Sequence, residues 1–198
     1  MRPQIFVIHG GDAFDTYEKY LANLRARTIT LERLSARGWK SLLRDHLADV
    51  ADVYSPEMPN KQNAKYAEWK IWFTNILPLM QDDVILVGHS LGGIFLAKYL
   101  SEETIPLKIR ATFLVAAPFN TADNHPLADF NLDRDLGKFH EQGGAITLYH
   151  STDDQVVPYS NLSDYQRLLP TARCVSFENR GHFNQESFPE IEEDLRKV

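Results

Sequence analysis

The sequence predicts an α/β fold, a three-layer sandwich in which helices cover both faces of a mostly parallel sheet of about six strands. Short apolar runs rich in β-branched residues, such as 5–8 and 84–87, are typical of strands buried on both faces. Segments with helical apolar spacing separate these runs, as crossover connections between parallel strands require. No repeat, linker or low-complexity segment is present, so we expect residues 1–198 to form a single domain.

The expected elements follow from the spacing of apolar residues and from the turn residues between them. Segment 61–80 carries tryptophan, tyrosine and phenylalanine on one broad helical face, which we interpret mainly as core; the alternative is that its upper end lines a substrate pocket. Segment 119–138 is polar and weakly periodic, so we expect a loop or small cap over the site. The expected strands are 5–8, 51–54, 84–87, 109–117, 145–150 and 172–177, and the expected helices are 15–26, 30–36, 39–47, 61–80, 94–100, 158–169 and 188–197.

Composition and charge narrow the range of partners. Apolar residues make up 43% of the chain and charged residues 24%, which is ordinary for a globular protein. The formal net charge of −6 argues against nucleic acid and against anionic membranes, and is compatible with a neutral small-molecule substrate. Cys174 is the only cysteine, which excludes an intrachain disulfide. We find no signal peptide and no apolar run of membrane-spanning length, and therefore expect a cytoplasmic protein with no membrane partner.

The stretch 82–100 carries the strongest functional signal. An apolar run leads into Gly88-His89-Ser90-Leu91-Gly92, and a segment with helical spacing follows. This is the strand–turn–helix context of a nucleophile elbow; the alternative is a glycine-rich turn with an incidental serine. We expect a strained backbone at Ser90 and collisions for any Cβ at the two flanking glycines. The turn would place the Leu91 N–H at the start of the helix, where negative charge is stabilised.

A serine nucleophile needs a base and a carboxylate that orients the base, and parallel strands bring such groups together at their carboxyl ends. Asp153 and Asp154 follow the fifth expected strand, and His182 follows the sixth. Ser90, an aspartate and His182 thus come in the chain order expected for an α/β-hydrolase. Spacing leaves the choice between Asp153 and Asp154 open, and we expect the other aspartate to form a turn or cap a helix.

The remaining histidines are expected to be structural. His9 precedes two glycines and is expected to shape the turn there, and His89 is expected to be buried beside the nucleophile. The other four show no ligand spacing with one another or with Cys174, so we expect no metal site. No dinucleotide-binding or phosphate-loop motif is present, so we expect no nucleotide cofactor.

These motifs resemble those of the α/β-hydrolase superfamily and, within it, of the small serine hydrolases of the retinoblastoma-binding protein 9 type. The similarity spans nearly the whole chain and includes Val7-Ile8-His9-Gly10-Gly11, Met58-Pro59, the elbow, Ser151-Thr152-Asp153-Asp154 and Gly181-His182-Phe183. The resemblance implies a shortened hydrolase fold with strand order 2-1-3-4-5-6. The residues that follow the serine, Leu91-Gly92-Gly93, are closer to lipases and esterases generally.

The resemblance also implies a role for each site residue. It marks Ser90 as the nucleophile, His182 as the base and Asp154 as the acid that orients it. The oxyanion would be held by the backbone N–H of Leu91 and by a second N–H from the first loop. Because that loop differs from the family pattern here, the second donor is either Gly11 or Asp12.

Together these features predict a metal-free serine hydrolase that cleaves a carboxylic ester of a small or medium acyl group through an acyl-enzyme. We expect a small-molecule ester or amide as the substrate, and no protein partner is indicated. The alternatives are an aminopeptidase- or amidase-like enzyme, a thioesterase, and a non-catalytic protein-binding module on the same fold. Four aromatic side chains are expected to line the substrate pocket: Phe14, Trp72, Phe119 and Phe183.

Overall fold

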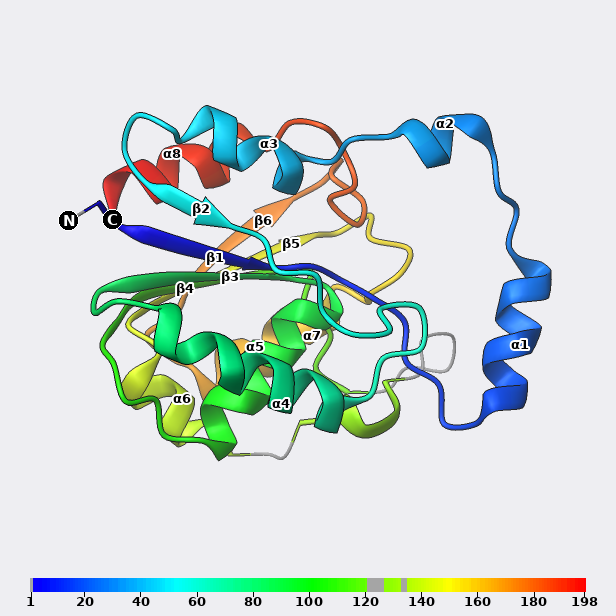
Figure 1. Cartoon of the computed structure of the whole chain (residues 1–198), viewed down its shortest axis with the longest axis horizontal. Coiled ribbons are helices and arrows are strands. Elements are labelled where there is room, and N and C mark those ends of the chain that lie inside the picture. The colour runs from blue at the N-terminus through cyan, green and yellow to red at the C-terminus, as the bar shows by residue number, and fades with distance from the viewer. Residues whose placement is uncertain (1, 121–126, 133–134) are drawn as a thin grey trace.

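In the computed structural model, which describes residues 2–120, 127–132 and 135–198, a parallel sheet runs through the centre of the molecule (Figure 1). Its six strands lie in the order β2-β1-β3-β4-β5-β6, which confirms the predicted order. All neighbouring strands pair in parallel, so their carboxyl ends meet at one edge of the sheet. The strands are β1 (Gln4–Ile8), β2 (Asp52–Tyr54), β3 (Val84–His89), β4 (Ile109–Val115), β5 (Ala145–Ser151) and β6 (Arg173–Phe177).

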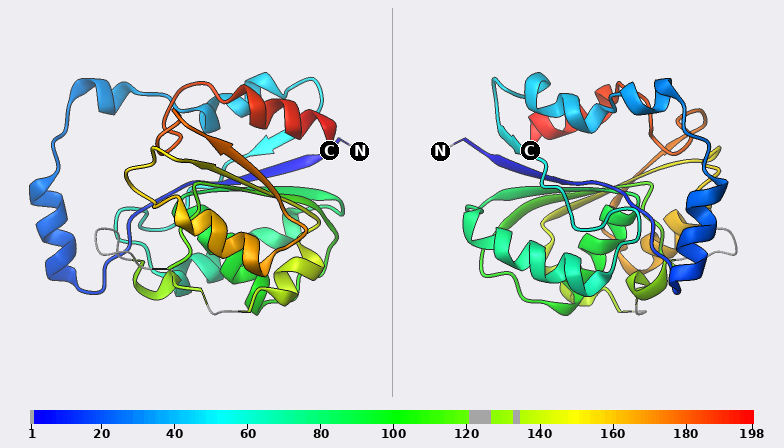
Figure 2. Two further views of the ribbon diagram at one scale, coloured as in Figure 1. Left: turned by 180° about the vertical axis from the view of Figure 1, so that it is seen from behind. Right: turned by 45° about the vertical axis from the view of Figure 1, so that its right-hand side comes forward.

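Helices cover both faces of this sheet. Helices α3 and α8 lie on one face, and α4, α5, α6 and α7 lie on the other (Figures 1 and 2). The described helices are α1 (Tyr17–Ala26), α2 (Leu31–Ser35), α3 (Trp39–His46), α4 (Tyr66–Ile76), α5 (Leu91–Glu102), α6 (Gly137–Gln142), α7 (Ser160–Leu168) and α8 (Pro189–Lys197), with 3₁₀ turns η1 (Leu77–Leu79) and η2 (Ala128–Phe130). None of the helices in the described ranges has both the length and the apolar character needed to cross a membrane.

Two helices differ from the sequence-based prediction. The helix expected over 61–80 begins only at Tyr66, because the preceding residues pair with the first loop: the Asp12 N–H donates to the Lys61 carbonyl, and the Ala64 N–H donates to the Asp12 carbonyl, both at 2.8 Å. Its last turn tightens into the 3₁₀ turn η1, which contains Pro78. Helix α6 was not predicted, since six residues are too few for a helical period to be recognised.

The side chains of each strand enter two separate cores in alternation. From β1, Ile5 and Val7 pack with Trp39 of α3 in the core below α3 and α8. Phe6 packs on the opposite face with Trp69 of α4, in the larger core. Both tryptophans are fully buried. The aromatic face of the long helix is therefore mainly core, as predicted.

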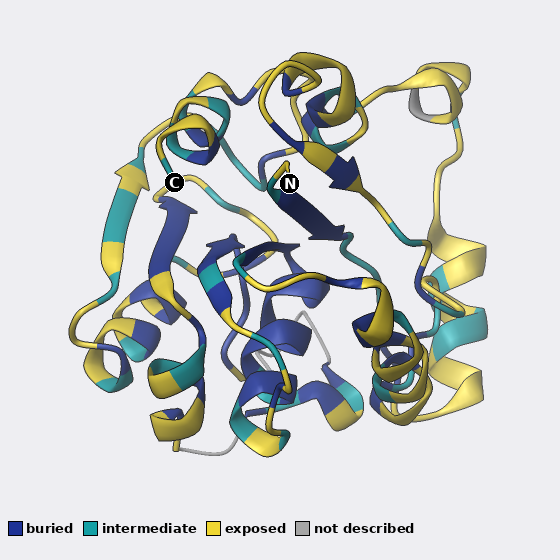
Figure 3. Ribbon diagram, turned by 60° about the vertical axis from the view of Figure 1, so that its left-hand side comes forward, coloured by how far each residue is buried: buried dark blue, intermediate teal, exposed yellow. Residues whose placement is uncertain are grey.

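Helices α1 and α2 stand apart from the three layers, and the segment that contains them, residues 16–36, is here called the arm (Figures 1 and 2). No residue of α1 is buried, and its ribbon in Figure 3 is exposed or intermediate throughout. The loop or cap predicted at 119–138 is described only in part, because 121–126 and 133–134 lie outside the described residues. Phe119 and Phe130, from the described part, are buried in the larger core.

Candidate active site

Ser90 occupies the sharp turn between β3 and α5. Its backbone angles, φ 55° and ψ −124°, lie in a region that residues with a Cβ rarely adopt. The backbone packs so closely around this turn that glycine is required on both sides of the serine. A Cβ on Gly88 would lie 2.6 Å from the Gly92 carbonyl oxygen, and a Cβ on Gly92 would collide with the carbonyl oxygen of Ile8. The predicted collisions at the two glycines are therefore present, and the serine stands at the tip of the turn.

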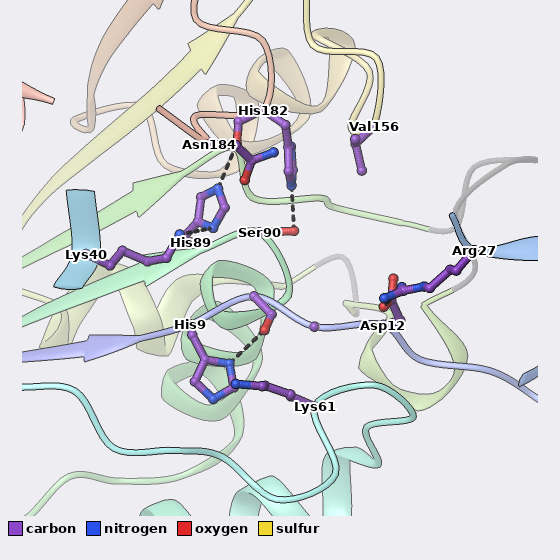
Figure 4. A pocket seen from close by; sticks show the side chains of 12 residues that line it. His9, Asp12, Arg27, Lys40, Lys61, His89, Ser90, Val156, His182 and Asn184 are labelled. Carbon is purple, nitrogen blue, oxygen red and sulfur yellow. Dashed lines mark hydrogen bonds and ion pairs between the residues drawn. The ribbon is translucent and has the colours of Figure 1, made fainter. Parts of the chain in front are cut away.

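His182 reaches Ser90 from the loop that follows β6. Its Nε2 lies 2.9 Å from Ser90 Oγ, although the two residues are 92 positions apart in the chain (Figure 4). On the other side of the ring, Nδ1 lies 2.8 Å from Oδ2 of Asp154, which follows β5. The three side chains thus meet at the carboxyl edge of the sheet, with the imidazole between the hydroxyl and the carboxylate.

The two adjacent aspartates have different partners. The side chain of Asp154 is fully buried, and its second oxygen accepts hydrogen bonds from the N–H groups of Val156 and Val157 at 2.8 and 3.0 Å. Burial alone would raise the pKa of the Asp154 carboxyl, but the bonds from His182 and from these N–H groups outweigh it and lower the pKa. Asp154 is therefore held as a carboxylate against the imidazole.

Asp153 instead organises the histidine loop. Its carboxylate accepts hydrogen bonds from the Ser151 hydroxyl, at 2.5 Å, and from the Gly181 N–H, at 2.8 Å. These bonds lower the pKa of the Asp153 carboxyl and connect the end of β5 to the residue before His182. Of the two aspartates, Asp154 is thus the one that contacts the imidazole, and Asp153 forms the turn beside it.

The backbone N–H groups near Ser90 differ in their availability. The Asp12 N–H is already used, because it donates to the Lys61 carbonyl at 2.8 Å. For Gly11 and Leu91, the structure shows no hydrogen bond from the backbone N–H to any described residue. These two residues are neighbours, since a Cβ on Gly11 would lie 3.4 Å from a methyl group of Leu91. Of the two candidates for the second donor, Gly11 is therefore the one that has a free N–H.

A family model for serine hydrolases matches residues 32–196, which is most of the chain. The chain belongs to the serine hydrolase family. No curated protein sequence matches this serine hydrolase.

Solved structures share its fold across nearly the whole chain. The ydeN gene product from Bacillus subtilis superposes with a TM-score of 0.77 at 21% identity, covering 98% of this chain and 97% of that one. A putative YdeN-like hydrolase from Pectobacterium atrosepticum has a TM-score of 0.67 at 14% identity, covering 98% and 90%. A meta-cleavage product hydrolase from Pseudomonas fluorescens IP01 has a TM-score of 0.70 at 13% identity, covering 98% and 89%. These likenesses place the serine hydrolase in the α/β-hydrolase fold.

The serine hydrolase has a cavity of about 490 Å³ onto which Ser90 and His182 open. Most of its lining residues have polar or charged side chains: besides Ser90 and His182 these are His9, Asp12, Arg27, Lys40, Lys61, His89 and Asn184, and the remaining lining residues are Gly10, Gly11 and Val156 (Figure 4). A volume of this size is typical of sites for small molecules. Within the described ranges, no group of three or more His, Cys, Asp or Glu residues is placed to hold a metal ion.

The aromatic lining predicted for this cavity is wrong. None of the four aromatic residues is among the lining residues of the serine hydrolase cavity. Trp72 lies on the outer side of α4 with 46% of its surface exposed. The other three are buried: Phe119 packs edge-on against Tyr165, Phe183 packs against Phe188 in the core below α8, and Phe14 lies at the base of the arm. Aromatic residues in a sequence do not show which ones face a core.

Two histidines of the serine hydrolase, the half-buried His9 and the buried His89, hold the loops around Ser90, as expected. His9 accepts the Met58 N–H through Nε2 and contacts the Gly10 carbonyl through Nδ1, at 2.8 and 2.7 Å, so Nδ1 carries the proton. His89 lies 2.9 Å from the His182 carbonyl through Nε2 and 3.1 Å from Lys40 Nζ through Nδ1. Burial, followed by the nearby positive charges, lowers the pKa of His89 well below its ordinary value, so this ring is neutral.

Three cations of the lining were not predicted: Arg27, Lys40 and Lys61. Lys40 lies at the start of α3 and Arg27 follows α1, positions where a basic residue in a sequence is usually a solvated charge. Only the fold brings these segments to the carboxyl edge of the sheet. No pattern in the sequence of the serine hydrolase distinguishes these cations from its other basic residues.

Proposed function

We propose that this serine hydrolase is a carboxylesterase that cleaves esters of small or medium acyl groups through a Ser90–His182–Asp154 triad. The observation that carries the proposal is the position of the His182 ring, 2.9 Å from the Ser90 hydroxyl and 2.8 Å from the Asp154 carboxylate. This is the arrangement that turns a serine hydroxyl into a nucleophile.

In the first half of the reaction, Ser90 Oγ attacks the acyl carbon while its proton passes to His182 Nε2. The carbonyl π bond opens as the Oγ–C bond forms, and the negative charge moves to the substrate oxygen. Asp154 accepts the Nδ1–H of the imidazolium, which keeps the ring in the required tautomer and stabilises its charge. When the tetrahedral intermediate collapses, the C–O bond to the alcohol breaks and His182 gives its proton to the leaving alkoxide.

The oxyanion is stabilised by the backbone N–H groups of Leu91 and Gly11. Neither group donates to another described residue, and the Leu91 N–H also lies at the positive end of α5. In related sites one such donor is worth about 3–4 kcal/mol of transition-state stabilisation. The free Gly11 N–H supports Gly11 over Asp12 as the second donor.

In the second half, water hydrolyses the acyl-enzyme. His182 takes a proton from the water as it attacks the acyl carbon, and returns this proton to Ser90 Oγ when the Oγ–C bond breaks. The carboxylic acid leaves and the site returns to its starting state. The cavity of about 490 Å³ supports acyl groups of small or medium size.

The test is intact-mass analysis after reaction with a fluorophosphonate. Wild type should gain one adduct, and the Ser90→Ala variant should gain none and lose activity by several orders of magnitude. Ser35→Ala serves as the control, because Ser35 lies in the arm and should leave labelling unchanged. No adduct on folded wild type would contradict the proposal and favour a non-catalytic binding module. Matched ester, thioester and amide substrates of one acyl group then test the preference for esters.

A further inference from the structure

Lys40 is a partly buried cation in the wall of the cavity. It is the second residue of α3, and its ammonium group lies 3.1 Å from Nδ1 of His89 and over the ring of Trp39. Figure 4 shows the side chain running along the cavity wall to His89, the residue before Ser90. The cation therefore belongs to the same wall as the proposed nucleophile.

Gly10 and His89 lie between this cation and Ser90, and the contacts that join them are short. A Cβ built on Gly10 would lie 3.5 Å from Nδ1 of His89 and 3.0 Å from the Cβ of Ser90. Lys40 Nζ contacts that same His89 nitrogen. Lys40 and Ser90 are therefore both separated from Gly10 only by short contacts, and both line the same cavity.

His89 does not neutralise this charge. Its ring is neutral, since Nε2 donates to the His182 carbonyl and Nδ1 is left to accept a hydrogen bond from Lys40. An ammonium group has three protons to donate, and the neutral imidazole accepts only one of them. The cation retains both its charge and unused donor capacity.

The other two cations of the cavity have carboxylate partners, and among the described residues Lys40 has none. Arg27 pairs with Asp12, and Lys61 pairs with Glu57 at 2.8 Å. No carboxylate of a described residue lies within 4.0 Å of the Lys40 ammonium. Burial lowers the pKa of Lys40 to about 8, which reflects the cost of holding an unpaired charge out of water. A bound anion would remove that cost.

We propose that Lys40 is a specificity-determining residue that selects esters carrying an anionic group, bound at the ammonium while the ester carbonyl lies at Ser90. This inference rests on the proposed esterase function. It goes beyond that function because it assigns a negatively charged class of substrate to the site. The net charge of the whole chain, −6, does not indicate a preference for anions. The anionic group lies in either the acyl or the alcohol part of the ester.

The test compares pairs of substrates that differ only in charge. In the first pair, monomethyl adipate has a carboxylate in its acyl part and methyl adipamate has a neutral carboxamide at the same place. In the second pair, 4-acetoxybutanoate has a carboxylate in its alcohol part and 4-acetoxybutanamide has the carboxamide there. In at least one pair, wild type should show a kcat/KM for the carboxylate about tenfold or more above that for the amide, as a charged hydrogen bond provides. The readout is this ratio, because damage to the triad affects both members of a pair equally.

Variants of Lys40 decide whether the ammonium causes the preference. Lys40→Met should reduce the ratio to about one, Lys40→Glu should invert it, and Lys40→Arg should retain most of it. Lys108→Met is the matched control: it also removes one charge, but Lys108 pairs with Asp83 at the opposite end of the sheet, so its ratio should equal that of wild type. Far-ultraviolet circular dichroism confirms that each variant is folded.

The failures are distinguishable. If wild type hydrolyses both members of both pairs equally well, or if Lys40→Met keeps the wild-type ratio, the role of Lys40 is wrong and the esterase function stands. If folded wild type hydrolyses no ester and gains no fluorophosphonate adduct, the proposed function itself is wrong, and the role of Lys40 is overturned with it.

Discussion

The Nε2 of His89 lies 2.9 Å from the main-chain carbonyl of His182 and donates a hydrogen bond to it, so the residue before the proposed nucleophile holds the loop that carries the proposed base. β3 and the loop after β6 are far apart in the chain, and this bond connects them in the wall of the cavity that both residues line. We regard His89 as a positioning residue, since it acts on the reaction through His182.

Replacement of His89 tests this positioning role. His89→Ala should lower kcat by up to about 100-fold with little change in KM, because a small displacement of the base slows proton transfer more than it weakens binding. His89→Gln should restore part of kcat, since an amide group can donate to the same carbonyl. Steady-state kinetics on one ester measure both constants. A rise in KM with unchanged kcat would show that His89 contributes to binding instead.

The strained backbone at Ser90 predicts a conflict between activity and stability. Glycine adopts positive φ without strain, so Ser90→Gly should have a free energy of unfolding about 1 kcal/mol higher than Ser90→Ala, although both are inactive. Urea denaturation followed by circular dichroism gives the comparison. Equal or lower stability of the glycine variant would mean that the turn stores no strain.

The different partners of the two aspartates predict different kinetic effects. Asp154→Asn should lower kcat by about 10⁴-fold, because the amide favours the wrong tautomer of His182. Asp153→Asn should have only a small effect, since its amide oxygen can still accept the Gly181 N–H. The pair forms its own control, as both substitutions remove one negative charge at neighbouring positions. A larger loss in the Asp153 variant would reverse the assignment.

The free N–H of Gly11 predicts that this position is more sensitive than the next. A Cβ on Gly11 would lie 2.5 Å from the Lys61 carbonyl oxygen, so Gly11→Ala must shift the loop and misplace the donor, lowering kcat by about 10²–10³-fold. Asp12→Asn leaves the backbone bond from residue 12 to Lys61 intact and should have a weaker effect on kcat. Comparable losses of kcat in both variants would contradict Gly11 as the donor.

The preference for anionic esters should depend on pH. Lys40 loses its proton as pH rises through about 8, so the ratio of kcat/KM between carboxylate and amide substrates should be constant from about pH 6, where the substrate carboxylate is ionised, up to that pH and fall above it. The titratable groups that interact with the ammonium are His89 and His9, and burial lowers the pKa of both, so neither histidine carries a charge in this range. Since kcat/KM reports the free enzyme, the bound anion does not shift this profile. A ratio that is flat to pH 10 would contradict the prediction.

Much of the fold and of the site could be predicted from the sequence, because both depend on local patterns. The buried runs gave the strands, and the Gly-x-Ser-x-Gly motif placed Ser90 on a turn whose geometry leaves few alternatives. The choice between Asp153 and Asp154 could not be made from spacing, since both follow β5 and only the loop geometry decides which one faces the imidazole.

The lining of the cavity could not be predicted, because it comes from segments that meet only in the folded chain. Phe119 and Phe183 look like pocket residues in a sequence, yet they fill the cores. Lys40 looks like an ordinary surface lysine at the start of a helix, yet α3 places it beside His89. Residue type predicted the positions of the proposed triad, because that chemistry requires a serine, a histidine and an aspartate. It did not predict which side chains line the cavity, because tertiary packing decides which ones are exposed there.

The position of the arm outside the two cores affects which substitutions this chain can tolerate. Because α1 contributes no side chain to either core, substitutions there remove little buried apolar surface. Arg27, at its end, nevertheless borders the cavity through its pair with Asp12. The entrance to the site can therefore be remodelled by mutation while the framework beneath it keeps its stability, so that the choice of substrate is separable from the capacity to fold.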